Sequence, residues 1–239
     1  MKDKIKMGNI LIDSYHRVRT EQYSALSRIK NSRFDLPQNK LIELEEIIYY
    51  PYEDIINRME REIFLLCNSM AVYKEFLSTV EGLDIYDALE LIVATKDIQR
   101  FPTVSKFWKW AGFSPVAYCR KCGKTKEACR CNSGDYYNAN EKRIKGVAPS
   151  YNENVKKLLI RIADKLKKGN GYYQDKYLEY EEYEYKKSPE LSDIHVQNRA
   201  KRKMIKLFLY HLFFNWYESV GREPLKPYAH LPPYELGDE

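Results

Sequence analysis

The chain has 239 residues, of which 44% are hydrophobic and 31% are charged, and its formal net charge is +6 at pH 7. This length is enough for one large domain or two small ones with a hydrophobic core. No apolar run is long enough to span a membrane, and the N-terminal residues lack the apolar segment and cleavage site of a secretory signal. These features exclude membrane and secreted classes, so we expect an intracellular (cytoplasmic) protein without a membrane partner, in which cysteines stay reduced.

Positive charge is concentrated in the middle of the chain. Residues 101–170 contain sixteen Lys and Arg side chains against five Asp and Glu, whereas acids outnumber bases in residues 51–100. Such a segregated basic block is typical of proteins that bind polyanions, although a solvated surface is the alternative. The sequence therefore predicts DNA, structured RNA or both as partners.

Residues 1–75 are predicted to form an N-terminal helical region. Residues 9–31 show a helical apolar stripe that consists of Leu11, Tyr15, Val18, Tyr23 and Leu26. Pro37 then opens a second helix, which is expected to stop near Pro51. Residues 52–76 are amphipathic again, and Cys67 lies near their apolar side, where we interpret it as a small core residue.

Residues 76–115 contain a segment that is similar to a helix-hairpin-helix. Two short helical patterns are joined by the letters EGLD, and Gly82 holds the first glycine position of the motif, while Asp84 stands at the second. Backbone N–H groups in such a hairpin bind a phosphate of nucleic acid, and a plain helix turn is the alternative. Thr103 is predicted to cap a short helix that ends at Gly112, and its residues Trp108 and Trp110 are packing groups or base-stacking platforms.

Residues 136–225 are predicted to form a C-terminal helical region. After a loop or short hairpin, Ser150 or Asn152 caps a strong helix, and a tyrosine-rich helix follows, with Tyr173, Tyr177 and Tyr180 on one stripe. The last helix, over residues 192–220, is expected to be the longest. On it, His195, Arg199, Arg202 and Lys206 form one polar stripe, which is either a solvated face or a row of phosphate contacts. Residues 226–239 are Pro-rich and are expected to form an extended tail.

Four of the five cysteines lie within residues 116–135, at Cys119, Cys122, Cys129 and Cys131. A Cys-x2-Cys pair delivers two thiolates from a tight turn, and the second pair completes the four ligands that tetrahedral Zn²⁺ prefers. Because four protein ligands leave no open position, we expect a structural zinc knuckle and not a catalytic metal. The predicted fold is therefore mainly α: a helical bundle with the hairpin-like segment and a small inserted zinc knuckle.

Basic residues around these motifs are the predicted nucleic-acid contacts. Together with Gly82, they are Lys106, Lys109, Lys121, Lys124, Lys126, Arg130, Lys142, Arg143, Lys145, Arg199, Arg202 and Lys206.

The order of motifs from about residue 75 to residue 229 resembles the C-terminal half of DEDD-type insertion-sequence transposases, the bridge-RNA-guided recombinases. The letters FLSTVEGLDIYDALELI resemble the family hairpin, KDIQRFPTVSKFWKWAGFSP resembles its DIxRF…aGLxP segment, and NSG resembles its SG pair. The ending from His195 onward is similar to archaeal members.

This resemblance implies a mostly helical domain with a serine nucleophile that attacks a DNA phosphodiester, and Ser133 is the matching position. Arg130, Lys142 and Arg143 would then stabilise phosphate charge. Residues 1–75 are too short and too helical for the family's ribonuclease-H-like nuclease domain, so we expect that domain and its metal-binding carboxylates to be lacking.

Three hypotheses follow. The first is a zinc-stapled nucleic-acid-binding protein that is not catalytic alone, and the second is an active recombinase subunit that uses Ser133. The third is a structural or interaction protein of a virus or plasmid. A second copy of the chain or a full-length transposase is an expected protein partner. A virus or another mobile element is the source that we consider for the chain.

Overall fold

A computed structural model describes residues 1–31, 36–131, 133–139 and 149–223, and their fold is mainly α, as the sequence predicts. The chain divides into two compact units: residues 1–74 with 84–96, and residues 75–83 with 97–239. The division into five regions stays a prediction. In the described part of the chain, every helix is too short or too polar to cross a membrane.

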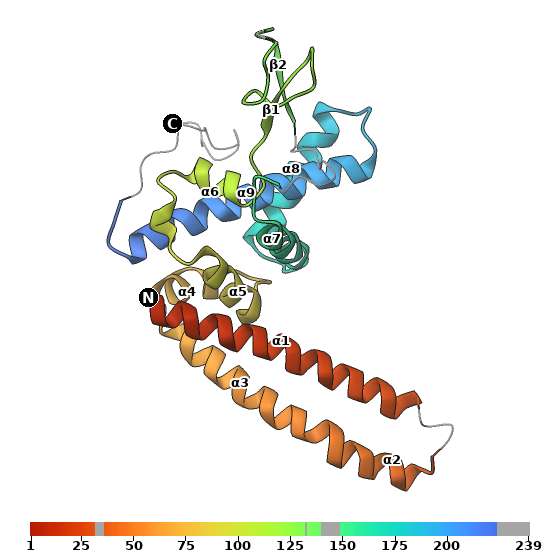
Figure 1. The fold of residues 1–239 in the computed structure, drawn as a ribbon. Coiled ribbons are helices and arrows are strands. Elements are labelled where there is room, and N and C mark those ends of the chain that lie inside the picture. The colour runs from red at the N-terminus through yellow and green to blue at the C-terminus, as the bar shows by residue number, and fades with distance from the viewer. Residues whose placement is uncertain (32–35, 132, 140–148, 224–239) are drawn as a thin grey trace. The chain divides into compact units, whose positions relative to one another are not determined.

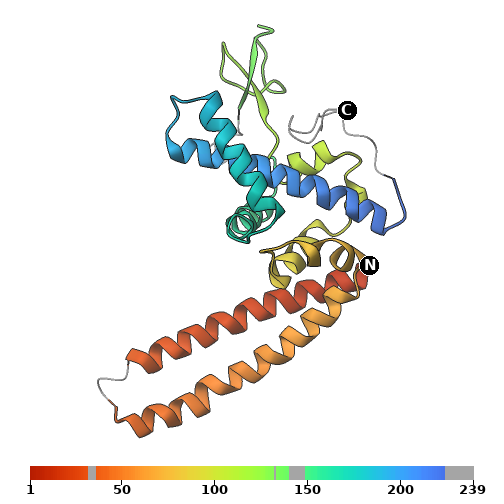
Figure 2. The same cartoon turned by 180° about the vertical axis from the view of Figure 1, so that it is seen from behind.

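The first unit is built on a long helical hairpin. Helix α1 (Lys2–Asn31) lies beside α3 (Tyr50–Asn68), with α2 (Gln38–Leu44) at the far end and α5 (Ile85–Thr95) against α1 and α3 near the other end (Figure 1). The reverse view shows the same pairing of α1 with α3 (Figure 2). Pro37 is the N-cap of α2, at the boundary that the sequence predicts.

The buried seam of α1 differs from the predicted stripe. The residues it buries are spaced alternately by three and four or by whole heptads: Ile5, Gly8, Ile12, Tyr15, Gln22, Ala25 and Ile29. Of the predicted stripe only Tyr15 is buried, and Tyr23 is 66% exposed. The helix also begins at Lys2, seven residues earlier than predicted, because Ile5 and Gly8 extend the same seam.

Pro51 does not end a helix, which corrects the prediction. A π-helical turn, Glu45–Tyr49, joins α2 directly to α3, and Pro51 lies in the first turn of α3. A proline inside a helix lacks the N–H that would bond the preceding turn, and the wider π turn accommodates this loss. The predicted break therefore becomes a change of helix geometry.

The amphipathic segment after Pro51 is also interrupted where one helix was predicted. Helix α3 ends at Asn68, and α4 (Ala71–Glu75) follows after a short turn in which Ser69 donates to the carbonyl of Leu66. Cys67 is fully buried, as predicted for a core residue, and burial raises the pKa of its thiol to about 12. Asp84 caps α5 by accepting a hydrogen bond from the backbone of Asp87 at 2.8 Å.

The second unit gathers around α9 (Asp193–Ser219). Helices α6 (Val104–Trp110), α7 (Glu153–Leu166) and α8 (Tyr172–Lys187) pack on it, together with a 3-10 turn, Ile98–Arg100. Thr103 caps α6 and Asn152 caps α7, both as predicted. The stripe of Tyr173, Tyr177 and Tyr180 is buried, so these side chains are core residues. Helix α9 has 27 residues and α1 has 30, so the last helix is not the longest.

Candidate metal centre and the basic residues around it

A small β-ribbon holds the four clustered cysteines. Strand β1 (Val116–Cys119) pairs antiparallel with β2 (Tyr136–Ala139), so that Val116 faces Ala139 and Cys119 faces Tyr136. On its other edge, β1 bridges to Thr125, with the backbone of Cys119 donating to the carbonyl of Lys124 at 2.8 Å. Strand β1 is therefore held on both sides, which fixes Cys119 at its end.

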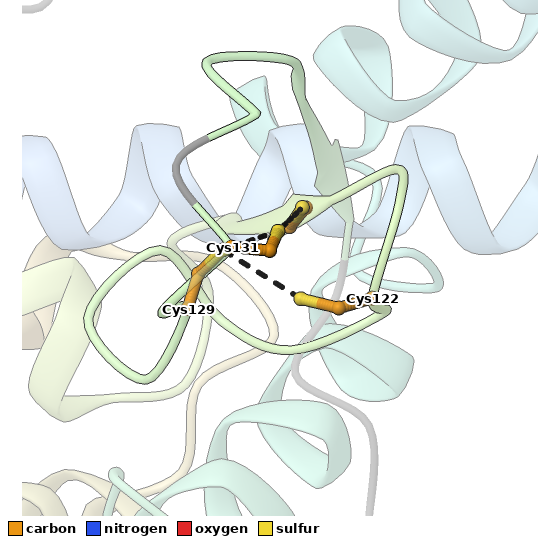
Figure 3. A group of neighbouring side chains, drawn as sticks. Cys122, Cys129 and Cys131 are labelled. Carbon is orange, nitrogen blue, oxygen red and sulfur yellow. Dashed lines mark hydrogen bonds between the residues drawn. The ribbon is translucent and has the colours of Figure 1, made fainter.

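Cys122 follows in a tight turn. The N–H of Gly123 donates to the carbonyl of Cys119 at 2.9 Å, and Gly123 has a φ of 67°, a conformation that favours glycine. Cys129 and Cys131 return on the next loop and face this turn. Figure 3 shows the side chains of Cys122, Cys129 and Cys131 directed toward one another. The Cys-x2-Cys turn and the second pair thus meet as the spacing predicts.

The four sulfurs have the separations that a tetrahedral metal needs. All four lie within 4.8 Å of one another, and the shortest contacts are 3.4 Å for Cys119–Cys131, 3.6 Å for Cys122–Cys129 and 3.2 Å for Cys129–Cys131. Zinc–sulfur bonds of about 2.3 Å in a tetrahedron place the sulfurs about 3.8 Å apart. Disulfide sulfurs would lie about 2.05 Å apart, so these cysteines are free. The cluster could hold one metal ion.

The environment of Cys119 favours its thiolate. Hydrogen bonds from the Ser133 hydroxyl and the backbone N–H of Cys122 lower the pKa of the Cys119 thiol to about 6. For Cys129, a backbone hydrogen bond from Cys131 also lowers the pKa. Thiolates are the form that binds metals, so both shifts suit a ligand role.

Ser133, the predicted nucleophile, contacts the metal cluster. Its Oγ lies 3.0 Å from the Sγ of Cys119, and the residue is exposed on its other side. A hydroxyl that donates to a metal-bound thiolate orients the ligand and offsets its charge. The geometry therefore gives Ser133 a supporting position beside the cysteines.

Exposed cations surround the cysteine loop. Lys121, Lys124, Lys126 and Arg130 are all exposed, and Lys106 and Lys109 are exposed on α6. Lys109 lies 3.7 Å from Glu127 of the cysteine loop. A cleft of about 350 Å³ lies there, with Lys109, Lys126 and Tyr151 among its lining residues. Lys142, Arg143 and Lys145 lie outside the described residues.

Gly82 lies in a packed turn. Its φ is +83°, and a Cβ built there would lie 3.0 Å from the carbonyl oxygen of Lys165 and 3.2 Å from the Cα of Gly169. A 3-10 turn, Leu77–Thr79, precedes it. The close approach of this turn to the end of α7 explains why a glycine is needed at position 82. A contact between Gly82 and a phosphate stays a prediction.

The predicted polar stripe of α9 divides into paired and unpaired cations. Arg199 lies 3.3 Å from the carboxylate of Glu184, which is buried on α8. Arg202 and Lys206 have no acidic partner among the described residues. His195 bonds the hydroxyl of Ser192 at 2.9 Å. The four side chains therefore do not act as one uniform row.

Base stacking on Trp108 is excluded by its burial. Trp108 is 3% exposed, and its indole N–H donates to the carbonyl of Lys206 at 3.0 Å. Trp110 is half-buried under the guanidinium of Arg100, 4.5 Å from its ring centre. The sequence reasoning missed the aromatic rings that do lie beside exposed cations near the ribbon, Tyr136 and Tyr137. Their signal was the YY pair that follows the cysteine cluster, with Lys126 and Arg120 reaching these rings.

Residues 74–137 match the model of the Transposase IS116/IS110/IS902 family. This segment includes the hairpin-like turn, α5, α6, β1 and all four clustered cysteines. No curated protein matches the chain, and no solved structure matches it either.

Proposed function

We propose that this chain is a zinc-stapled nucleic-acid-binding protein related to the C-terminal domain of insertion-sequence transposases, and that it is not catalytic alone. Zinc is the metal that four clustered thiolates bind best as a closed structural site. One observation carries the proposal: the cysteine cluster lies inside the segment that resembles the transposase family and is ringed by exposed Lys and Arg side chains.

The cysteine loop supplies the reason for a metal. Residues 120–131 and 133–135 contribute no buried side chain, so a loop of this kind gains its order from ligand bonds. Once ordered, it holds Lys121, Lys124, Lys126 and Arg130 on a fixed frame, where their charges face solvent. Phosphates of DNA or RNA are the partners that such cations attract, and binding to them releases counterions.

Fluorescence anisotropy with a labelled 30-base-pair duplex and a labelled RNA hairpin tests the proposal between 50 and 300 mM KCl. We expect the logarithm of the binding constant to fall linearly with the logarithm of salt concentration, with a slope of about −0.9 for each phosphate contacted in duplex DNA. Binding that ignores salt, or no binding to either probe, would contradict it. In a variant with Lys121, Lys124 and Lys126 all changed to Gln, the binding constant should depend less steeply on salt concentration, because fewer phosphates are contacted.

An active recombinase subunit is the second candidate, because Ser133 is exposed on the side away from Cys119. In that reaction the Ser133 oxygen would attack a DNA phosphorus and displace the 3′ or 5′ oxygen, leaving a phosphoserine ester. The hydrogen bond to the Cys119 sulfur favours the supporting role instead. Denaturing electrophoresis after incubation with labelled DNA separates the two, since a covalent adduct that disappears in Ser133→Ala would establish the recombinase.

A further inference from the structure

Helix α9 carries five cations between Arg199 and Lys206, and three of them have carboxylate partners. Arg199 and Lys203 both reach the buried carboxylate of Glu184, at 3.3 and 2.7 Å. Lys201 pairs with Asp164 of α7 at 2.5 Å. Two carboxylates, those of Glu184 and Asp164, therefore partner three of the five cations of α9.

Arg202 and Lys206 are the two cations of α9 that have no carboxylate among the described residues. They lie one helical turn apart, so their side chains leave the same face of α9. The guanidinium of Arg202 lies 5.8 Å from the ring centre of Phe113, and the ammonium of Lys206 lies 4.2 Å from that of Trp108. Both rings are buried, so the cations rest on an apolar floor formed by Trp108 of α6 and by Phe113, three residues beyond the end of that helix.

This arrangement is costly for the two charges. Both side chains are only partly exposed. Burial lowers the pKa of Arg202, and burial together with the charge of Arg202 lowers the pKa of Lys206. The negative faces of the Phe113 and Trp108 rings offset part of this cost. They do not offset the mutual repulsion, which an anion held between the two side chains would remove.

We propose that Arg202 and Lys206 form a binding site for one phosphate of a nucleic-acid backbone. A guanidinium presents two parallel N–H donors that match two phosphate oxygens, and the ammonium adds a point charge from one turn away. Partial desolvation makes each contact stronger than the same contact on a fully exposed side chain. The identity of the ligand rests on the proposed function, whereas the anion site itself rests on the geometry of α9.

The double variant Arg202→Met with Lys206→Met tests the site, because methionine keeps an apolar stem on the rings and removes only the charge. Lys201→Met is the matched control, since it removes one charge from the same helix at an already paired position. In the anisotropy titration, we expect the double variant to bind the 30-base-pair duplex at least tenfold more weakly at 100 mM KCl. The magnitude of its salt slope should decrease by about 0.9, which is the value for one phosphate contact. Lys201→Met should change neither quantity.

The outcomes separate this inference from the proposed function. If the wild-type chain binds the duplex and the double variant binds with unchanged affinity and slope, the Arg202–Lys206 site is refuted and the proposed function stands. If the wild-type chain binds neither duplex nor RNA, calorimetry with inorganic tripolyphosphate decides. If the wild-type chain binds tripolyphosphate and the double variant does not, the result supports the anion site without the proposed function. If the wild-type chain does not bind tripolyphosphate, the anion site is refuted.

If circular dichroism shows that the double variant does not fold, a second measurement on the wild-type chain tests the site. The wild-type chain is acetylated with and without saturating duplex, or with and without tripolyphosphate if the duplex does not bind, and its lysines are read by peptide mass spectrometry. We expect the ligand to slow the acetylation of Lys206 at least threefold, while Lys201 reacts at the same rate. Equal rates at Lys206 with and without ligand would overturn the inference.

Discussion

Substitution of Gly82 by alanine separates a packing role from a phosphate-binding role at the hairpin-like turn. The backbone of Gly82 has a φ of +83°, which an L-residue with a Cβ adopts at a cost of about 1–2 kcal/mol. The added Cβ would also lie 3.0 Å from the carbonyl oxygen of Lys165 and 3.2 Å from the Cα of Gly169. Both neighbours are backbone atoms, which cannot rotate away as a flexible side chain does.

Forced overpacking of this kind costs about 1–3 kcal/mol, so Gly82→Ala should lower the free energy of unfolding by about 2–5 kcal/mol. Two other glycines divide this figure into its parts. Gly221 has a φ of +68° with open space around its Cβ position, so Gly221→Ala reports the conformational cost alone. For Gly169, the Cβ position lies 3.0 Å from Gly82, and no positive φ applies, so Gly169→Ala reports the overpacking alone.

Urea unfolding followed by circular dichroism gives the three free energies, and anisotropy under folding conditions gives nucleic-acid binding. A packing role predicts the largest destabilisation for Gly82→Ala and unchanged binding by the folded variant. A destabilisation by Gly82→Ala no larger than that by Gly221→Ala would refute the reasoning from close approach. Weakened binding with unchanged stability would instead favour the phosphate contact.

Three further predictions concern single side chains. Ser133→Ala removes the hydroxyl bonded to Cys119, so zinc affinity measured by competition with a chelator should fall roughly tenfold, the lower end for such supporting contacts; unchanged affinity would argue against the supporting role. Glu184→Gln leaves Arg199 and Lys203 without their carboxylate, and because both cations are partly exposed to solvent it should cost about 1–2 kcal/mol at pH 7. Burial raises the pKa of Glu184, but Lys203 and Arg199 hold that pKa below its ordinary value of 4.5. The contribution of Glu184 to the free energy of unfolding is therefore complete above pH 4.5 and is lost as the pH falls through the pKa of Glu184 in the folded chain. A wild-type chain whose stability relative to Glu184→Gln did not fall over that range would contradict this. Trp108→Phe loses the indole N–H bond to the Lys206 carbonyl and should cost about 1 kcal/mol in urea unfolding, whereas no loss would mean that water replaces that bond.

Local signals in the sequence were sufficient for the caps and the cysteine cluster. Thr103 and Asn152 precede apolar periodic segments, and a cap needs only the backbone two or three residues ahead. The four cysteines lie within one short loop, so their spacing alone brings the sulfurs together. Tyrosine periodicity likewise gave the buried stripe of α8.

Features that depend on partners distant in the chain could not be read in this way. The seam of α1 includes Gly8 and Gln22, which carry no hydrophobic signal, and the small side chain of Ala25. A Cβ at Gly8 would lie 2.7 Å from Val93, a contact that no spacing reveals. Arg199 and Arg202 look alike in the sequence, and only the position of Glu184 on α8 makes the first a paired cation.

Ser133 shows how the fold changes an interpretation without changing a residue. The SG pair suggested an exposed nucleophile, while the ribbon brings the Ser133 hydroxyl to the Cys119 sulfur across fourteen positions of the chain. A serine so placed serves the cysteine cluster first, whether or not its exposed side also meets DNA.

The most direct test of the account measures nucleic-acid binding by one protein sample before and after its zinc is removed. The chain is purified without chelators, its zinc is quantified, and anisotropy with the 30-base-pair duplex is recorded before chelation, after chelation and after zinc is restored. The account predicts one zinc per chain, binding at least tenfold weaker without it, and recovery when zinc returns. A chain without zinc, or one that binds the duplex equally well in all three states, would contradict the account.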